Sequence, residues 1–360
     1  YSPTMGIQGI PLSSSPRRFY RLQEVDSSFS AKLSSGAITS LRRTFDSEVT
    51  EYISGGKLGN LRINYQPTGG GTWYPVNTAT PSGVASVSYS STTNANGTQY
   101  TSRYLLTNGL AGSLICESVI SIKLDTVQWF VNFTNLTAQS VTIGDLALPL
   151  PMNTTYSGVT SIAMKHSFIS GYGSFVFWMR PDSVGPCLLM TPDDNTKLEF
   201  WDVRAPGYEV YVHSYVAGTN AAAQFPTVTT HGDRWRHPNT SLTLGAGGSR
   251  SYSLKFQWAN DYDGIRQALV DEGKVDVHIV PGMTLPTNLF AQIALRTTQT
   301  VSSVTSEFPA QTQFQFLGVT NVNADTYQLY QVQFARLGEN KLTINYGNSR
   351  TMYLEFFVTE

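Results

Sequence analysis

The stretch of this chain that is richest in ligand-binding groups is THGDRWRHPNT, residues 230–240, which contains His231, Asp233, Arg234 and Trp235. Proteins bind sugars with aromatic faces that cover C–H surfaces and with charged side chains that make paired hydrogen bonds. The stretch offers both, so we expect it to contact a carbohydrate. The alternative is a surface loop whose Arg and Asp pair with each other and whose Asn239 carries a glycan.

A second set of candidate sugar contacts lies in a glycine-containing stretch and consists of His166, Tyr172, Trp178 and Arg180. The glycines indicate close backbone approach or positive φ, which an interface between domains explains as well as a ligand does. Trp73 follows a triple-glycine turn, where we expect an exposed ring that can stack on a sugar. Three further tryptophans occupy apolar positions of alternating segments and are predicted to be core residues: Trp129, Trp201 and Trp258.

Paired carboxylates could catalyse glycoside hydrolysis, which needs two carboxyl groups about 5 to 10 Å apart. Asp193 and Asp194 are adjacent, but the sequence Pro-Asp-Asp-Asn around them is typical of a turn with side-chain to backbone hydrogen bonds. Glu199 and Asp202 flank two aromatic residues, an arrangement that a solvated strand face also produces. We therefore assign no catalytic residue to this chain.

No metal, cofactor or nucleophile site is predicted. His231 and His237 do not have the spacing that places two imidazoles on one helix face. The segment 260–264 is similar to the start of a calcium loop, but Ile265 and Arg266 occupy positions that need an oxygen ligand and a glycine. Neither a G-x-S-x-G elbow nor a phosphate-binding G-x-x-x-x-G-K-[ST] loop occurs.

Composition favours sheet and argues against two classes of partner. Charged residues make up 14% of the 360 residues and aromatic residues 12%, a balance typical of half-buried strands. The 24 Lys and Arg against 25 Asp and Glu give a net charge of -1, so no basic field attracts nucleic acid. No apolar run reaches the about 18 to 20 residues that span a bilayer, so no membrane partner is expected.

Asn-X-Ser/Thr triplets indicate a secreted, extracellular glycoprotein. They occur in polar or turn-like settings at Asn96, Asn132, Asn135, Asn153 and Asn239. Chance would also produce some of them, and Asn132 and Asn135 are too close for both to be occupied. The two cysteines, Cys116 and Cys187, are expected to form one disulfide bridge, which fits an oxidising compartment.

The elements that must position these groups are predicted to be antiparallel strands. Apolar and polar residues alternate in residues 127–133, 251–258, 330–334 and 342–346, which indicates one buried and one solvated face. Turn sequences such as Ser-Ser-Gly at 34–36 and Asn-Gly at 108–109 separate the strands at hairpin spacing. Only the segment from about Asp261 to Glu272 has helical spacing, with Asp261 or Asp263 as cap and Gly273 as terminator.

The predicted fold class is all-β, with two β domains. Residues 1–18, with several Pro and Ser, are expected to form an extended arm. Residues 19–259 are too many for a seven-stranded sandwich of about 100 residues, so they are predicted to form two large facing antiparallel sheets. Residues 260–275 are expected to form a helical linker, and residues 276–360 a small immunoglobulin-like β-sandwich.

Four stretches resemble a little-characterised family of secreted fungal and bacterial carbohydrate-active proteins: FSAKLSSGAITSLRRTFD, HSFISGYGSFVFWMRPDSVGPCLLMTPDDNTKLEFW, PGMTLPTNLFAQIALRT and GENKLTINYGNSRTMYLEFFV. The resemblance implies a galactose-mutarotase-like β-supersandwich, a small β-sandwich and then an (α/α)6 toroid that carries the catalytic carboxylates. Glu360 lies where that toroid would begin. The resemblance therefore implies that the chemistry lies outside these residues.

The function expected from these observations is that of a noncatalytic N-terminal β region of a secreted glycoside hydrolase or polysaccharide-degrading enzyme. It would support a toroid in the same parent chain, or in a second chain after proteolytic nicking, and lend loops to a cleft for an oligo- or polysaccharide. Two other interpretations stay open. One is a stand-alone carbohydrate-binding or adhesive wall protein, and the other is a structural shell or filament subunit, whose close packing bulky glycans would hinder.

Overall fold

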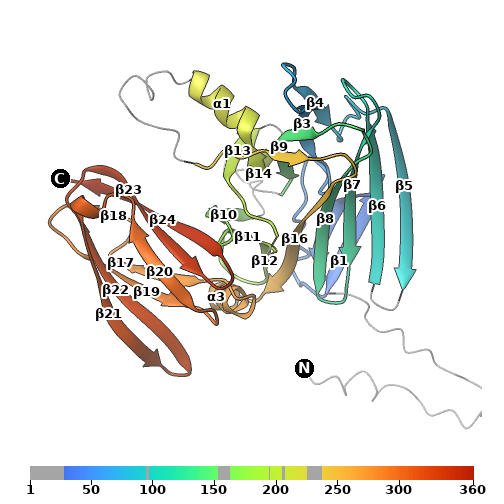
Figure 1. Cartoon of the computed structure of the whole chain (residues 1–360). Coiled ribbons are helices and arrows are strands. Elements are labelled where there is room, and N and C mark those ends of the chain that lie inside the picture. Colours follow the sequence, from blue (N-terminus) through green and yellow to red (C-terminus); the bar gives the residue numbers. More distant parts are fainter. Residues whose placement is uncertain (1–27, 95–96, 153–162, 194, 205–206, 225–236) are drawn as a thin grey trace, which may run out of the picture.

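The computed structural model describes residues 28–94, 97–152, 163–193, 195–204, 207–224 and 237–360 (Figure 1). These residues form two β-sandwiches, which confirms the predicted all-β class. In Figure 1 the larger sandwich lies at the right, and the smaller one, in orange and red, lies at the left.

The first sheet of the larger sandwich contains eight strands among the described residues, in the order β10, β11, β12, β16, β8, β7, β6 and β5, with every pair antiparallel. Their bounds are β5 (Ser86–Asn94), β6 (Gly97–Leu106), β7 (Leu114–Ile122), β8 (Thr126–Asn135), β10 (Met164–Phe168), β11 (Phe175–Met179), β12 (Cys187–Pro192) and β16 (Ser249–Ala259).

The second sheet lies opposite the first. Within the described ranges it has six strands: β13, β14, β9, β3 and β4 in that order, with β15 also paired to β9. Their bounds are β3 (Arg62–Pro67), β4 (Tyr74–Asn77), β9 (Val141–Leu150), β13 (Phe200–Arg204), β14 (Gly207–Ser214) and β15 (Leu242–Leu244).

Alternating side chains build the core between these two sheets. On β8, Val127, Trp129, Val131 and Phe133 are each no more than 1% exposed, whereas the residues before and between them are half-buried. They share a hydrophobic cluster with Leu146 of the opposite sheet. The period of two predicted for residues 127–133 is therefore the physical reason why this strand has one buried face.

A short hairpin, β1 (Phe29–Ser34) and β2 (Ala37–Arg43), packs on the same core through Ile38 and Leu41. Its turn is the predicted Ser-Ser-Gly sequence. Gly36 has φ +71°, a conformation that glycine adopts without the steric cost of a Cβ.

The smaller sandwich consists of two four-stranded sheets in the described part of the chain, with orders β17, β19, β22, β21 and β18, β24, β23, β20. Their bounds are β17 (Asp276–Val280), β18 (Thr284–Pro286), β19 (Ala291–Arg296), β20 (Val301–Ser306), β21 (Thr312–Val322), β22 (Asp325–Phe334), β23 (Gly338–Tyr346) and β24 (Arg350–Thr359), with a 3-10 turn at Pro309–Gln311. It has its own core, which includes Val332, Phe334 and Phe356. Pairing is antiparallel except between β18 and β24.

The predicted helix is confirmed as α3 (Tyr262–Asp271), which connects the two sandwiches. The Asp261 side chain caps it by accepting a hydrogen bond from the Gly264 backbone N–H at 2.7 Å. Gly273, with φ +68°, follows its last turn. Ile265 packs against Phe177 and Leu189, on the outer face of the eight-stranded sheet.

A second helix, α1 (Tyr215–Gln224), was not predicted, because the sequence analysis assigned this whole region to sheet. It lies above the six-stranded sheet in Figure 1. Its first backbone N–H groups, those of Val216 and Ala217, donate to a carboxylate oxygen of Asp145, which is far away in the sequence. A local sequence pattern does not reveal a cap that only the tertiary structure supplies.

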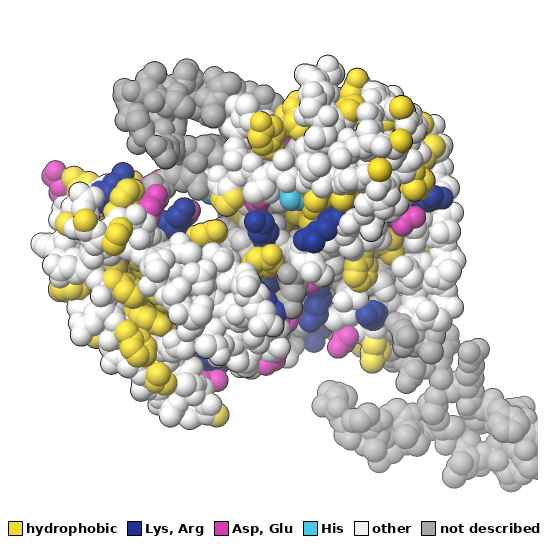
Figure 2. Space-filling view, in the orientation of Figure 1, with side chains coloured by type: hydrophobic (Ala, Val, Ile, Leu, Met, Phe, Trp, Pro, Cys, Tyr) yellow, Lys and Arg dark blue, Asp and Glu magenta, His cyan; other side chains and the backbone are white. Residues whose placement is uncertain are grey.

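The two sandwiches meet where the loop between β10 and β11 touches β24. The Ser170 Oγ donates to the Tyr353 carbonyl at 2.8 Å, and Lys274 Nζ donates to the Tyr172 and Pro192 carbonyls at 2.9 Å each. A Cβ added at Gly173 would come within 2.7 Å of the Met352 side chain. Figure 2 shows Lys and Arg side chains gathered in the middle of this face of the molecule.

The predicted disulfide is wrong, because both cysteines are free and buried. Cys116 on β7 and Cys187 on β12 are separated by β8 and β16 in the same sheet, or about 14 Å at the usual strand spacing. A bridge needs Cα atoms within about 7 Å of each other. Cys116 also faces the core, whereas Cys187 lies in the cluster under α3.

The structure also contradicts the glycan site predicted at Asn135, whose side chain is 0% exposed. Its Nδ2, the atom that would carry a glycan, donates to three backbone carbonyls at 2.8 to 3.0 Å. Asn132 is half-buried and Asn239 is exposed, so both stay predictions. Asn96 and Asn153 lie outside the described residues, as does the predicted arm 1–18.

Candidate functional site

A set of convergent polar side chains lies on the outer face of the six-stranded sheet. Strand alternation sends Ile63 of β3 and Leu146 of β9 into the core and places their neighbours on the opposite face. Register then aligns Asn64 with Asp145, and Arg62 with Ala147. A row of polar groups therefore crosses the sheet beneath α1.

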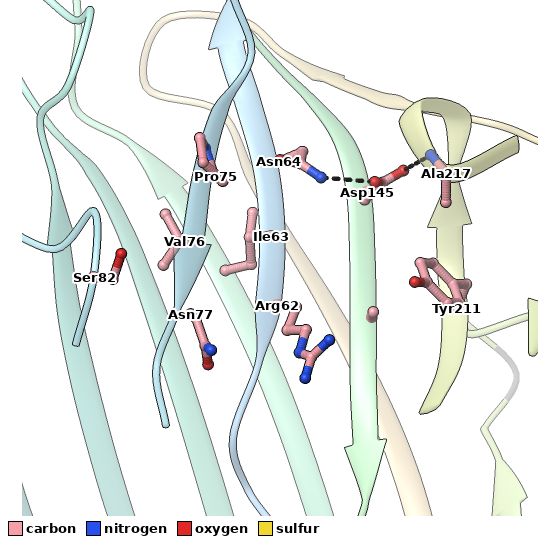
Figure 3. Close-up of a pocket in the computed structure, with 11 residues that line it drawn as sticks. Arg62, Ile63, Asn64, Pro75, Val76, Asn77, Ser82, Asp145, Tyr211 and Ala217 are labelled. Atoms are coloured by element: carbon pink, nitrogen blue, oxygen red, sulfur yellow. Dashed lines mark hydrogen bonds between the residues drawn. The ribbon is translucent and has the colours of Figure 1, made fainter. Parts of the chain in front are cut away.

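Asp145 holds α1 against this face. The Asp145 Oδ1 accepts the backbone N–H groups of Val216 and Ala217 at 2.8 and 3.1 Å, and its Oδ2 accepts Nδ2 of Asn64 at 2.8 Å (Figure 3). A carboxylate at a helix N-terminus satisfies unpaired N–H groups and complements the helix dipole. The side chain is 5% exposed, and its role is to position the helix that forms one wall of the site.

Glu209 of β14 is a second buried carboxylate on this face, at 2% exposure. The Tyr211 hydroxyl donates to one of its oxygens at 2.6 Å, and a guanidinium nitrogen of Arg62 lies 3.4 Å from the other. A buried charge costs free energy unless it is paired and hydrogen-bonded, and here both conditions are met. Arg62 is thereby fixed with its guanidinium at the edge of the site.

These groups border a pocket of about 360 Å³. Figure 3 shows its walls, formed by strands β3, β4, β9 and β14 and by the start of α1. Polar groups come from Arg62, Asn64, Asn77 and Ser82, and apolar surface comes from residues such as Pro75 and Ala217. The lining is therefore more polar than apolar, which suits a ligand that carries many hydrogen-bonding groups.

Two of the polar side chains that line the pocket hold its walls together. Its tyrosine hydroxyl already donates to Glu209, and its aspartate caps α1. In the part of the chain that the structure describes, no group of three or more His, Cys, Asp or Glu side chains could hold a metal ion. Hydrogen-bonding amides, a guanidinium and a hydroxyl are the groups that recognise sugar hydroxyls.

The first predicted site does not enter this description, because His231, Asp233, Arg234 and Trp235 lie outside the described residues. A buried network fixes the end of that stretch. Glu199 accepts hydrogen bonds from the Thr240 backbone N–H at 2.9 Å and from the Thr240 hydroxyl, and the two nitrogens of His213 contact Thr240 Oγ1 at 2.9 Å and the Tyr252 hydroxyl at 2.5 Å. Glu199 is thus a structural residue, 2% exposed.

Trp73, predicted as an exposed platform, is half-buried and lies beside α1. Its ring centre is 5.9 Å from that of Tyr215, the first residue of the helix. A Cβ added at Gly144 would come within 2.6 Å of the Trp73 ring, so the glycine makes room for the indole. The tryptophan helps to seat α1.

The second predicted set is dispersed. His166 is exposed on β10 and stacks on Phe177, with ring centres 4.7 Å apart. Tyr172 lies in the loop between β10 and β11, where its carbonyl accepts a hydrogen bond from Lys274 Nζ. Arg180 forms an ion pair with Asp46 at 3.1 Å and donates from Nε to the Val184 carbonyl at 2.7 Å. Trp178 is a core residue, and none of the four residues lines the pocket beneath α1.

Two of the three predicted core tryptophans follow the prediction and one does not. Trp129 is 1% exposed, and Trp258 is partly buried against the larger core. Trp201 is 41% exposed, although its partner Val210 faces the core. The reason is that β13 is the edge strand of its sheet, so the opposite sheet covers the Trp201 side chain only in part.

The pocket residues were missed by the sequence analysis. A partial signal was present, because Arg62, Asn64 and Gln66 alternate with Ile63 and Tyr65 in the sequence. That pattern predicts a polar strand face, but it does not say which distant strands align with it.

Comparison with models of known families shows the family of this chain. A model of a family of unknown function, DUF5695, matches residues 46–360. The chain belongs to this family. No curated protein is similar enough to this sequence to be matched.

Among solved structures, a polysaccharide lyase, BACCELL_00875, matches 92% of this chain with a TM-score of 0.63 and 14% sequence identity. The chain spans 46% of that lyase. The match to a galactose mutarotase-like protein from Clostridium acetobutylicum covers 65% of this DUF5695 chain and 94% of that protein. Its TM-score is 0.40 and its sequence identity is 11%. The match to the GH36 α-galactosidase AgaA from Geobacillus stearothermophilus covers 58% of this chain and 32% of that enzyme. Its TM-score is 0.31 and its sequence identity is 9%.

The similarity to the lyase shows that this DUF5695 chain shares its β fold over nearly the whole described length. Among the described residues, no helix is long and apolar enough to cross a membrane.

Proposed function

We propose that this chain is the noncatalytic β region of a carbohydrate-processing enzyme, a polysaccharide lyase or glycoside hydrolase, and that it holds a carbohydrate in the pocket beneath α1. The observation that carries the proposal is the pocket itself, with a guanidinium and an amide from β3, an amide from β4, and hydroxyl groups from Ser82 and from Tyr211 of β14. The catalytic helical domain would belong to the same parent protein or to a second chain.

A sugar fits the chemistry of this pocket better than a charged metabolite does. The positive charge of Arg62 is already balanced by Glu209, and Asp145 is satisfied by Asn64 and by the N-terminus of α1. What remains available is a set of neutral donors and acceptors beside small apolar surfaces. Hydroxyl groups and C–H faces of a pyranose complement such a surface.

The two buried carboxylates of the pocket are the reason why we assign catalysis to another domain. Glycoside hydrolysis requires one carboxyl group to transfer a proton and another to act as base or nucleophile. Glu209 and Asp145 are instead held by hydrogen bonds that build the site. Support also comes from the lyase, of which this chain spans 46%, so the remaining part of such a protein is where we assign the chemistry.

Secretion is part of the same proposal. Asn239 is exposed and belongs to an Asn-Thr-Ser triplet, so it is the acceptor that the fold leaves most accessible among the described candidates. Mass spectrometry of the native protein would detect a glycan there.

The test is a screen of the 360-residue chain on an array of neutral and acidic oligosaccharides, followed by calorimetry with the best binder. Ala217→Gln places a longer side chain at the lip of the pocket, on α1. Thr219→Gln adds the same side chain to an exposed position of the same helix and is the control. We expect Ala217→Gln to weaken binding about tenfold or more and Thr219→Gln to leave it unchanged. Equal affinity of both variants and the native chain would refute the pocket as the binding site.

A further inference from the structure

The two sheets of the larger sandwich end side by side at strands that have no further neighbour among the described residues, β10 in one sheet and β13 in the other. Register shows which side chains face the core at this edge. Lys165 of β10 pairs with Trp178, a core residue, and Trp201 of β13 pairs with Val210, another core residue. Lys165 and Trp201 therefore point toward the space between the sheets, where the sandwich opens to solvent.

Lys165 has unusual surroundings for a lysine. Its Nζ lies 3.4 Å from the ring centre of Tyr208 and 5.4 Å from that of Trp201. Within the described ranges, no carboxylate forms an ion pair with it. Partial burial lowers the pKa of its amine to about 8, so most Lys165 side chains are still cationic at neutral pH. A cation whose contacts are aromatic faces keeps its capacity to pair with an anion.

Two buried hydrogen-bond donors lie beside this lysine. The Trp178 indole N–H, in a side chain that is 0% exposed, has no hydrogen-bond partner among the described residues. The Tyr208 hydroxyl, in a side chain that is 3% exposed, makes no hydrogen bond of normal geometry there, although Ser167 lies near enough to affect its pKa. Buried polar groups are nearly always hydrogen-bonded, so the Trp178 N–H is a donor next to Lys165 that the described residues leave unsatisfied.

We propose that this open edge is a binding subsite for a carboxylate-bearing sugar, a uronic acid unit, whose carboxylate pairs with Lys165 and whose ring packs on Trp201. Trp201 is 41% exposed, so one aromatic surface is available to cover a pyranose face. The Lys165 ammonium supplies the charged donor that binds a carboxylate oxygen.

This subsite is distinct from the pocket beneath α1. The side chains of Trp201 and Tyr208 are on the face of the six-stranded sheet that is turned toward the core. Those of Arg62, Asn64 and Tyr211 are on its opposite face. The inference rests on the proposed function only for the choice of a sugar as ligand. It adds that an acidic polysaccharide would contact the chain at a second place.

The experiment is calorimetric titration of the 360-residue chain with tri-galacturonic acid and, separately, with its methyl ester, which keeps the rings and removes the charges. Lys165→Met removes the ammonium and keeps an aliphatic stem. Lys341→Met is the matched control, because Lys341 Nζ also lies over a tyrosine ring, that of Tyr353, at 5.2 Å in the smaller sandwich.

We expect Lys165→Met to weaken tri-galacturonate binding about tenfold or more, the scale of one charge-assisted hydrogen bond, with Lys341→Met unchanged. We expect Trp201→Ala to weaken binding of both the acid and the ester. As a measurement that needs no variant, the NMR resonance of the Lys165 ε-carbon should shift when tri-galacturonate is added to the native chain.

The two proposals fail separately. Tri-galacturonate binding that Ala217→Gln abolishes and Lys165→Met leaves intact would overturn the edge subsite and support the pocket. Binding that Lys165→Met weakens and Ala217→Gln does not would support the edge subsite alone. Absence of any Lys165 resonance shift at saturating tri-galacturonate would also overturn it.

Discussion

Acidification is expected to destabilise the larger sandwich through His213. This side chain is 8% exposed, and its two nitrogens contact the hydroxyl groups of Thr240 and Tyr252. Burial, helped by the positive charges of Lys197 and Arg250, lowers the pKa of His213 from its ordinary 6.5 to about 4. A protonated imidazole would lack an acceptor nitrogen and would carry an unpaired charge in a buried position.

The magnitude follows from the two pKa values. Above pH 6.5 the imidazole is neutral in both the folded and the unfolded chain, so it adds no pH dependence. Between pH 6.5 and 4, His213 is mostly protonated in the unfolded chain and mostly neutral in the folded chain. The free energy of unfolding therefore falls as the pH falls. Each pKa unit is worth about 1.4 kcal/mol. By pH 4.5 the loss from His213 amounts to about 2.5 kcal/mol.

Urea denaturation of the native chain and of His213→Gln, at pH 7 and at pH 4.5, measures this loss. Other groups titrate equally in both proteins, so the native chain should lose about 2.5 kcal/mol more than the variant on acidification. His166→Gln, a change at an exposed histidine, should behave like the native chain. An identical pH dependence for the native chain and His213→Gln, or an NMR titration midpoint of His213 above pH 6, would refute the reasoning.

Three further predictions concern side chains that build the larger sandwich. Asn135→Asp should lower the free energy of unfolding, measured with urea, by at least about 3 kcal/mol, because a carboxylate would face the three carbonyls to which the amide now donates. Asn132→Asp on the same strand should lower it by less than half as much, and an equal loss would contradict the role assigned to Asn135. Asp145→Ala should cost about 1 to 2 kcal/mol through loss of the α1 cap, and unchanged stability would speak against that cap. Cys116 and Cys187 should not react with Ellman's reagent in the folded chain, because both are buried and burial raises the pKa of both thiols. Both should react fully after unfolding. A disulfide-linked peptide in a non-reduced digest would contradict this prediction.

Local patterns predicted much of the fold. The alternation in residues 127–133 required one buried face, and β8 has it. Helix α3 was predictable because Asp261, Ile265 and Gly273 supply a cap, a buried contact and a terminator within the segment itself. Helix α1 has no such local signals, since Asp145 of a distant strand provides its cap.

The errors share a physical origin in long-range arrangement. Alternation gave the correct face for Trp201, but it contains no information on whether another sheet covers that face. The triplet at Asn135 satisfies a glycosylation pattern, yet the fold uses its amide to bind carbonyls from a segment more than a hundred residues away. Pairing of the two cysteines required a knowledge of strand order, which separates them by two strands.

The candidate pocket could be predicted only in part for the same reason. The polar residues of β3 are visible as an alternating pattern, but their alignment with Asp145 and Tyr211 depends on a sheet order in which β9 lies between β3 and β14. Sequence analysis instead favoured clusters of neighbours along the chain, such as residues 230–240. Sites on a sheet face gather residues across strands, so their members are rarely close in sequence.

The most direct test of the proposed function is a crystal structure of the chain soaked with the oligosaccharide that binds best on the array. The account predicts density for at least one sugar ring beneath α1, with hydroxyl groups within hydrogen-bonding distance of Asn64, Asn77 or Arg62. A bound sugar that lies elsewhere, with this pocket holding only solvent at saturating ligand, would contradict it.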